Sequence, residues 1–274
     1  MSSTNQPGGG RSAPRETVRL AAVADVHCTR NSAGTLAPIF TEAASQADVL
    51  LLGGDLTDYG LPEEARVLAR ELTAVKIPIL AVLGNHDCES GQDAEVVKIL
   101  SEAGVQILDG DSVEVEGVGF AGVKGFCGGF GRRTLEPWGE AATKAFVHEA
   151  VAEALKLERA LARLRTPQRV ALLHYAPVEA TVEGEPREIF PFLGSSRLEE
   201  PLNRYQVTVA FHGHAHRGAA EGRTSSGIPV FNVAMPLLRR TLSDALPVRI
   251  VEIPALMAVS AGAEAPSRRR DDLH

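Results

Sequence analysis

The chain has 274 residues, of which 44% are hydrophobic and 23% are charged, and its formal net charge is −7 at pH 7. This length and apolar content suit one large α/β domain with a sizeable core. The longest basic run is Arg268-Arg269-Arg270 near the C-terminus. A duplex nucleic-acid binder needs a basic face to displace counterions, so we expect no such partner.

Nothing in the sequence indicates a membrane protein or a secreted one. Residues 1–17 are rich in Ser, Gly, Pro and Arg and lack the apolar segment of a signal peptide. No apolar run approaches the roughly 20 residues of a membrane-spanning helix. Three cysteines, an odd number, do not suggest a disulfide framework. We therefore expect a soluble cytoplasmic protein with one domain over residues 17–256, flanked by disordered tails at 1–16 and 257–274.

The first third of the chain alternates short apolar runs with amphipathic segments. Apolar runs at residues 18–24, 49–52 and 77–83 predict three buried strands, each followed by Asp or Asn within a few residues. Between them, residues 36–47 and a segment that begins near Pro62 have apolar residues at helical spacing. This βαβαβ order predicts parallel, adjacent strands, and such sheets collect ligands at the carboxyl ends of their strands.

The rest of the chain predicts a second, mixed sheet that packs on the first. Residues 92–103 predict a helix that Gly104 ends, and residues 113–123 predict a β-hairpin around Gly117. A long helix is expected over residues 138–165. Further strands are expected at residues 170–173, 207–211, 228–233 and 248–253.

Five short motifs with metal-binding residue types stand at the ends of the apolar runs. They are Asp25-Val26-His27, Gly54-Asp55, Gly84-Asn85-His86-Asp87, His174 and Gly213-His214-Ala215-His216. Asp, Asn and His offer hard-to-borderline ligands that suit divalent metals. Each motif alone is weak, because a single Asp at a strand end is more often a turn or cap residue. All five in this order indicate one shared metal site, and the motif glycines would let the ligands approach.

In this order the motifs resemble those of the calcineurin-like metallophosphoesterase superfamily, and the resemblance runs from about Val18 to about Val233. It implies an α/β fold in which two packed mixed β-sheets are sandwiched between helix layers. It also implies two divalent metal ions, for which Mn, Fe, Zn and Co suit the ligands almost equally. The implied ligands are Asp25, His27 and His216 for one ion and Asn85, His174 and His214 for the other, with Asp55 as the bridge.

The resemblance further implies hydrolysis of a phosphoester by in-line attack of a water or hydroxide that bridges the two ions. His86 is the implied catalytic residue, which would bond a phosphoryl oxygen or protonate the leaving alkoxide. We expect Asp87 to accept the other ring N–H of His86 and fix its tautomer. Asp58 is expected to form local hydrogen bonds, and His212 is expected to be structural.

Departures from other branches of the superfamily narrow the substrate class. Tyr59 stands where the protein Ser/Thr phosphatases carry an arginine, Asp87 replaces their usual Glu, and Asp58 stands where purple acid phosphatases have a metal-bound tyrosine. The motifs look most like small bacterial phosphodiesterases of the cyclic-nucleotide type. We therefore predict a phosphodiesterase that acts on a small molecule, with cyclic nucleotides as one candidate.

Two alternatives stay open at this point. The first is a broad-specificity phosphomonoesterase that acts on nucleotides or sugar phosphates. A cationic side chain near the metals would favour it, since monoesters carry more charge. The second is a non-catalytic scaffold with the same fold. Degenerate scaffolds usually lack the catalytic histidine or several ligands, whereas this chain has both His86 and a residue at every ligand position.

Substrate contacts are expected from Asn85, from His86 and from the loops at residues 125–133 and 177–194. Candidates to stack on a base or aryl group are Phe126, Phe130, Phe190 and Phe192, and Arg217 is a candidate phosphate contact. A solvated surface charge is the simpler interpretation of Arg217. A homodimer through the apolar segment 233–238 is a further hypothesis, with a buried strand end as the alternative. We expect Cys28, Cys88 and Cys127 to be small neighbours of the site.

Overall fold

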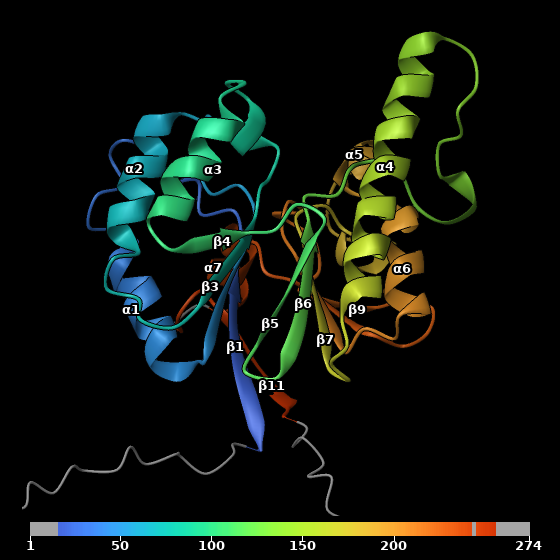
Figure 1. Cartoon of the computed structure of the whole chain (residues 1–274). Helices are drawn as coiled ribbons and strands as arrows, with labels where there is room; N and C mark the ends of the chain where they lie inside the picture. Colours follow the sequence, from blue (N-terminus) through green and yellow to red (C-terminus); the bar gives the residue numbers. More distant parts are fainter. Residues whose placement is uncertain (1–15, 243–244, 256–274) are drawn as a thin grey trace, which may run out of the picture.

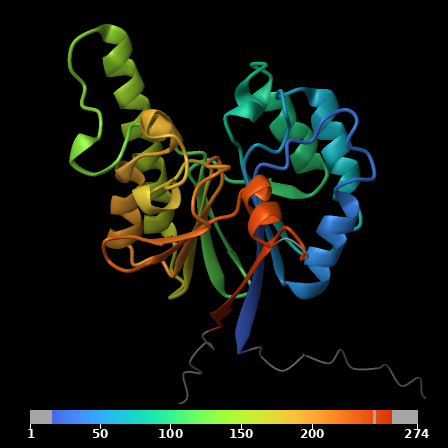
Figure 2. The same ribbon diagram turned by 180° about the vertical axis from the view of Figure 1, so that it is seen from behind.

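The computed structural model describes residues 16–242 and 245–255. Two mixed β-sheets pack face to face, and helices cover the outer face of each sheet (Figures 1 and 2). The predicted sandwich of two sheets between helix layers is confirmed. The expected tails fall outside the described residues, apart from Glu16.

The first sheet has five strands in the order β11-β1-β2-β3-β4. Its parallel strands are β1 (Thr17–Val23), β2 (Val49–Gly53), β3 (Ile79–Val82) and β4 (Val105–Ile107), and β11 (Arg249–Pro254) pairs antiparallel with β1. Its helices are α1 (Ala37–Gln46), α2 (Pro62–Glu71) and α3 (Asp93–Glu102). The predicted βαβαβ order is confirmed. The prediction placed β11 in the second sheet, which is wrong, and it did not include the three-residue strand β4.

The second sheet has six strands in the order β5-β6-β7-β8-β10-β9. They are β5 (Asp111–Val115), β6 (Val118–Val123), β7 (Arg169–Leu173), β8 (Val209–His212), β10 (Pro229–Asn232) and the unpredicted β9 (Glu221–Arg223). The predicted hairpin forms between β5 and β6, and Glu116 and Gly117 at its turn both have positive φ, as tight hairpin turns require. Helices α4 (Ala141–Arg163) and α6 (Glu199–Arg204) cover this sheet.

Two segments differ from the prediction. The loop after β7 is not wholly irregular, because it contains 3-10 turns at Glu179–Thr181 and Arg187–Ile189 and the short helix α5 (Phe190–Leu193). Residues 233–238 lead into the helix α7 (Met235–Thr241) instead of ending a strand. Val233 and Leu238 there are at most 2% exposed. The large apolar side chains of this segment are therefore buried within the fold, as in the alternative to a dimer surface.

Burial on both faces explains why the strands are continuous apolar runs. Along β1, Leu20 and Ala22 pack against the second sheet, whereas Ala21 and Val23 pack against the layer of α1, α2 and α3. Parallel strands buried in this way bring their carboxyl ends to one edge. Within residues 16–242 and 245–255, no helix combines the length and the apolar character needed to cross a membrane.

Candidate metal centre

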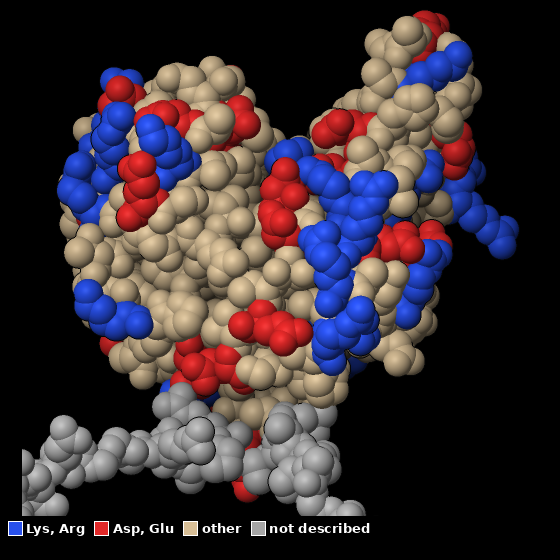
Figure 3. All heavy atoms as spheres, viewed as in Figure 1, with Lys and Arg blue, Asp and Glu red and all other residues tan. Residues whose placement is uncertain are grey.

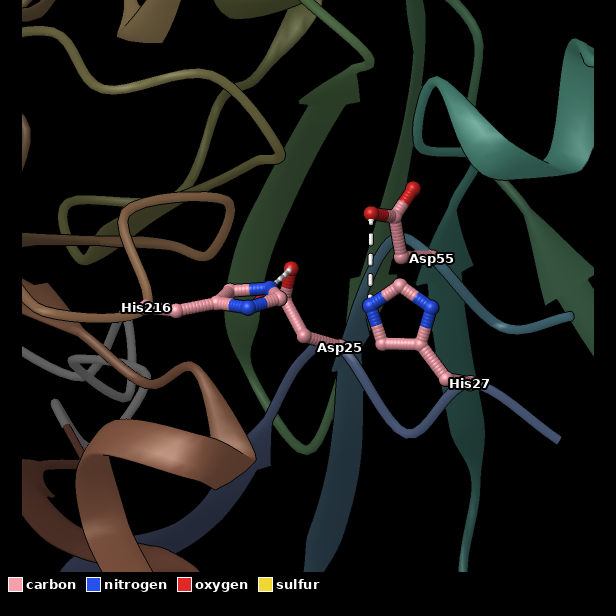
Figure 4. A group of neighbouring side chains, drawn as sticks. All are labelled: Asp25, His27, Asp55 and His216. Atoms are coloured by element: carbon pink, nitrogen blue, oxygen red, sulfur yellow. Dashed lines mark hydrogen bonds and ion pairs between the residues drawn. The ribbon is translucent and has the colours of Figure 1, made fainter. Parts of the chain in front are cut away.

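All of the predicted metal ligands lie just beyond the carboxyl ends of β1, β2, β3, β7 and β8. Two groups of side chains that share Asp55 each bring their ligand atoms within 4.8 Å of one another; they are Asp25, His27, Asp55 and His216, and Asp55, His174 and His214. A third such group, His27, Asp58 and His86, shares His27 with the first. Figure 4 shows the first group, with the side chains turned toward one another. Asp55 belongs to the first two groups, which is the arrangement that a bridging carboxylate needs.

In the first group, one ring nitrogen of His27 has no partner. His27 Nδ1 donates to Asp58 Oδ1 at 3.1 Å, while its Nε2 is buried without a hydrogen bond and lies 3.7 Å from Asp55 Oδ2. His216 Nε2 lies 3.0 Å from Asp25 Oδ1. A buried, unpartnered nitrogen that faces two carboxylates fits a cation ligand, and Asp58 fixes the tautomer that ligation requires.

In the second group, the main chain holds both histidines. His174 Nδ1 donates to the Gly53 carbonyl at 3.0 Å, and His214 Nε2 donates to the Phe192 carbonyl at 3.1 Å. These bonds leave the His174 Nε2 and His214 Nδ1 lone pairs for a metal. The His174 Nε2 lone pair then faces Asn85 Oδ1 at 3.0 Å with no proton between them. A cation would satisfy both atoms.

The backbone is strained where it carries the ligands. Among the described non-glycine residues with positive φ are Asp25 (55°), His27 (42°), Asp55 (47°) and His214 (68°). The left-handed conformation costs an L-residue roughly 1–2 kcal/mol. Strain of this kind concentrates at functional sites, where the surrounding structure holds it in place.

The motif glycines make room for the ligands, as expected. A Cβ at Gly54 would lie 2.5 Å from His174 Nδ1, closer than Cβ atoms approach their neighbours. A Cβ at Gly84 would overlap Asp55 Oδ1, and one at Gly213 would overlap Asp25 Oδ2. Each glycine therefore allows a ligand to approach the main chain of another strand end.

Asp58, not Asp87, orients the predicted catalytic histidine. His86 Nδ1 donates to the Asp58 carbonyl at 2.7 Å. Asp87 is fully buried and accepts hydrogen bonds from the N–H groups of Leu56, Thr57 and Gly84 and from the Thr57 hydroxyl. The predicted Asp87–His86 pairing is wrong, because His86 Nδ1 bonds the Asp58 carbonyl and the Asp87 carboxylate bonds Leu56, Thr57 and Gly84. Asp87 instead ties the turn after β2 to the turn after β3.

The protonation states suit metal binding. Burial raises the pKa of Asp25, but its hydrogen bond with His216 and the charges of neighbouring histidines outweigh burial and lower this pKa to about 2. Burial lowers the pKa of His214 to about 3. At neutral pH Asp25 is therefore a carboxylate and His214 a neutral imidazole, the forms that bind metals, whereas the hydrogen bond with Asp25 raises the pKa of His216.

The pKa of His86 is shifted in the opposite direction to that of His214. Burial lowers its pKa, yet the hydrogen bond to the Asp58 carbonyl and the charge of Asp55 outweigh burial, so its pKa lies above the usual value. This histidine is suited to donate a proton near neutral pH. His212, which is fully buried, has its pKa lowered by burial to about 4 and bonds Thr181 and the Gly213 carbonyl, consistent with the expected structural role.

The side chains predicted to contact the substrate differ in their exposure and packing. Phe130 is 7% exposed and packs in a cluster with Ala215, so its ring is not free to stack. Phe126 packs against Phe146, and the Lys124 ammonium lies over its ring. The expectation that Phe126 and Phe130 stack on a substrate therefore finds no support. Arg217 is exposed.

Two other aromatic side chains are open beside the site. Phe192 is 56% exposed, and its own carbonyl holds His214. Tyr59 is 55% exposed and follows Asp58, which holds both His27 and His86. Figure 3 shows a notch between the side of the molecule that carries α2 and α3 and the side that carries α4, at the end toward which the parallel strands run.

The chain belongs to the calcineurin-like phosphoesterase family, whose model matches residues 18–218. It is a phosphoesterase-family hydrolase, and the side chains described above could bind metal. The phosphopantetheinyl hydrolase PptH from Mycobacterium tuberculosis has a similar structure, with 16% identity, a TM-score of 0.59 and coverage of 90% of this chain and 98% of PptH.

A second similar structure is GAP50, described as the anchor in the inner membrane complex of Plasmodium. It has 13% identity, a TM-score of 0.50 and coverage of 81% of this chain and 73% of GAP50. At these identities the likeness concerns the fold alone. No curated protein matches the chain.

Proposed function

We propose that this protein is a dinuclear-metal-dependent phosphodiesterase that acts on small phosphodiesters. The observation that carries the proposal is the ligand set around Asp55, in which a buried His27 nitrogen has no partner and the His174 and Asn85 acceptors face each other. When bound, two divalent ions would polarise the phosphate and lower the pKa of a water molecule. Mn, Fe, Zn and Co all suit these ligands.

His86 acts as the general acid in this proposal. Its Nδ1–H stays on the Asp58 carbonyl, which leaves Nε2–H for the oxygen of the leaving alcohol. After this proton transfer the imidazole is neutral and Asp58 still holds its orientation. Asp58 also holds His27, so one residue would set the position of both the acid and a metal ligand.

We infer a diester because cations beside the ligands are engaged with main-chain carbonyls. Arg240 Nη1 donates to the His216 carbonyl at 3.1 Å. Lys124, whose carbonyl accepts the His174 N–H, turns its ammonium to the Gly125 carbonyl and to two aromatic rings. A diester carries one negative charge and needs only the metals to balance it, whereas a monoester carries close to two.

Tyr59 and Phe192 are candidates to contact one ester group of the substrate. Each is more than half exposed, and each belongs to a segment that contacts a different ligand group. We infer that they contact a planar or apolar group on one ester arm, such as an aryl group or the base of a cyclic nucleotide. Because a similar structure is named a phosphopantetheinyl hydrolase, a phosphopantetheinyl diester is a further substrate to assay.

A paired assay tests the proposal. The protein loaded with Mn²⁺ is assayed for kcat/KM on bis-p-nitrophenyl phosphate and on p-nitrophenyl phosphate. Asn85→Ala is the test variant, and Asn203→Ala is the matched control, because Asn203 bonds Ser225 and Glu199 away from the metal ligands. We expect a diester preference that Asn85→Ala abolishes and Asn203→Ala retains.

Other outcomes of this assay would favour the alternatives. A monoester preference would favour a nucleotide or sugar phosphatase. Inactivity on the two aryl esters and on the phosphopantetheinyl diester, with metal bound, would favour a scaffold.

A further inference from the structure

A buried polar cluster lies behind the loop that carries His214 and His216. It consists of Thr181, His212 and Asn232, which are 0%, 0% and 1% exposed, and we call it the polar brace. Its members come from the turn Glu179–Thr181, the end of β8 and the end of β10. Burying polar groups is unfavourable unless they are hydrogen-bonded, so the partners of the brace show what it holds.

The Asn232 side-chain amide forms hydrogen bonds through both its nitrogen and its oxygen. Its Nδ2 donates to the carbonyls of Ala215, at 2.8 Å, and Thr181, at 3.3 Å. Its Oδ1 accepts the Ala234 N–H at 3.1 Å. Ala215 stands between the metal ligands His214 and His216, so this amide fixes the middle of the ligand loop.

The same asparagine reaches the other side of the site through the main chain. The Ala24 N–H donates to the Val233 carbonyl at 2.9 Å, and the Met235 N–H donates to the Ala24 carbonyl at 2.8 Å. Ala24 directly precedes Asp25, and the turn that the Asn232 side chain caps therefore lies against the strand end that carries this carboxylate. Asn232 therefore connects the segment that carries His216 with the segment that carries Asp25.

His212 and Thr181 hold the beginning of the ligand loop. His212 Nδ1–H donates to the Gly213 carbonyl at 2.8 Å, and the Thr181 hydroxyl donates to His212 Nε2 at 2.7 Å. A Cβ at Gly218 would overlap the Thr181 carbonyl, so the chain that leaves the ligand loop also passes close to the brace. The two hydrogen bonds hold the start of the ligand loop at Gly213, and the close approach of Gly218 places the end of the loop beside Thr181.

We propose that Asn232 is a positioning residue that sets the distance between His216 and Asp25 and thereby the metal affinity of that side of the centre. The proposal rests on the metal centre proposed above. Asn232 lies beyond residues 18–218, which the family model matches, and its hydrogen bonds within the described part of the chain go to main-chain groups. It acts through the Ala215 carbonyl and the turn beside Ala24.

The substitution Asn232→Asp tests this role with little change in shape. A carboxylate oxygen would replace the amide donor and face the carbonyls of Ala215 and Thr181, both of which are acceptors. Mn²⁺ dissociation constants are measured by titration calorimetry on metal-free protein, together with the Tm of that protein. Asn203→Asp, a partly buried asparagine in contact with other polar groups, is the matched control.

We expect one of the two Mn²⁺ dissociation constants to rise about 10–100-fold in Asn232→Asp, as outer contacts of ligands typically give, while the other changes less than about threefold. Saturating Mn²⁺ should restore kcat, and Asn203→Asp should leave both constants unchanged. If Asn232→Asp does not fold, Asn232→Ser, which keeps one donor, should show a smaller shift of the same constant.

A lower Tm with both metal constants unchanged would overturn the proposal and reduce Asn232 to a structural residue. Failure of the unmodified protein to bind Mn²⁺ would instead refute the metal centre itself. The two failures are therefore distinguishable, because the second appears before any variant is compared.

Discussion

The substitution Gly84→Ala tests the position of the Asp55 carboxylate. A Cβ at Gly84 would overlap Asp55 Oδ1 and would lie 2.8 Å from Asp55 Cγ, whereas Cβ contacts under 3.0 Å are essentially never seen. Gly84 is not among the glycines with positive φ, but its Cβ would also lie close to the Asp55 backbone nitrogen, at 2.3 Å, so the main chain of Asp55 has to shift together with its carboxylate. Asp55 must therefore move.

The size of the effect follows from the contacts that Asp55 makes. Its Oδ1 accepts the His86 N–H at 2.9 Å and lies 3.4 Å from His174 Nε2, and its Oδ2 lies 3.7 Å from His27 Nε2. A displacement of roughly 1 Å costs on the order of 10²-fold in rate, or about 2.7 kcal/mol in the barrier. Overpacking should also lower the free energy of unfolding by about 1–3 kcal/mol.

The assay is kcat/KM on bis-p-nitrophenyl phosphate at saturating Mn²⁺, with the metal content measured in parallel. Gly91→Ala is the control, because Gly91 has a positive φ of 68° and open space around its Cβ position. It should lose about 1 kcal/mol of stability and keep its activity. Wild-type kcat/KM and full metal content in Gly84→Ala would refute the claim that Asp55 sits between the two ligand groups.

Four further substitutions test other parts of the site. His86→Ala should lower kcat about 10²–10⁴-fold with the metal content unchanged, and a loss of metal would show that His86 is a ligand. Asp58→Ala should weaken Mn²⁺ binding about 10–100-fold, since His27 loses its partner; unchanged calorimetric affinity would contradict this. His212 has a pKa of about 4 against 6.5, so the folded state binds fewer protons than the unfolded state between these values and loses stability as pH falls. From pH 6.5 to 5 the loss should be about 2 kcal/mol in urea titrations, and an equal slope in His212→Gln would contradict it. Phe192→Ala should raise KM for the aryl diester roughly fivefold, from about 1 kcal/mol of ring contact, whereas Trp138→Ala, which removes a 62% exposed ring, serves as the control; equal effects would refute an aromatic contact at Phe192.

The sequence alone predicts the fold, and it places the proposed ligands at strand ends, for a local reason. The strands that position the ligands are buried on both faces, so each is a continuous apolar run, and each ends just before its ligand motif. The apolar runs before Asp25 and Asp55 therefore predict a strand and also place the ligand side chain at the end of that strand. Parallel pairing of β1, β2 and β3 then brings the motifs together.

Other parts of the site have no local signal. His86 and Asp87 are adjacent in a three-residue turn. A turn this short has no repeating pattern of residue types, so the sequence does not show that the two side chains have different partners. Asn232 bonds main-chain groups 17 and 51 residues away, and main-chain groups leave no trace in residue types. Whether Phe130 or Phe192 is buried depends on how the loop folds over Ala215. The strands β4 and β9 have three residues each, too few to show a pattern.

The most direct test of the central claim is the number of Mn²⁺ ions bound per chain, measured by native mass spectrometry on the reconstituted protein. Two ligand groups that share Asp55 predict two ions per chain, and Asp55→Asn should bind fewer than two. A maximum of one ion per chain, or two ions in Asp55→Asn with unchanged affinity, would contradict a dinuclear centre bridged by this carboxylate.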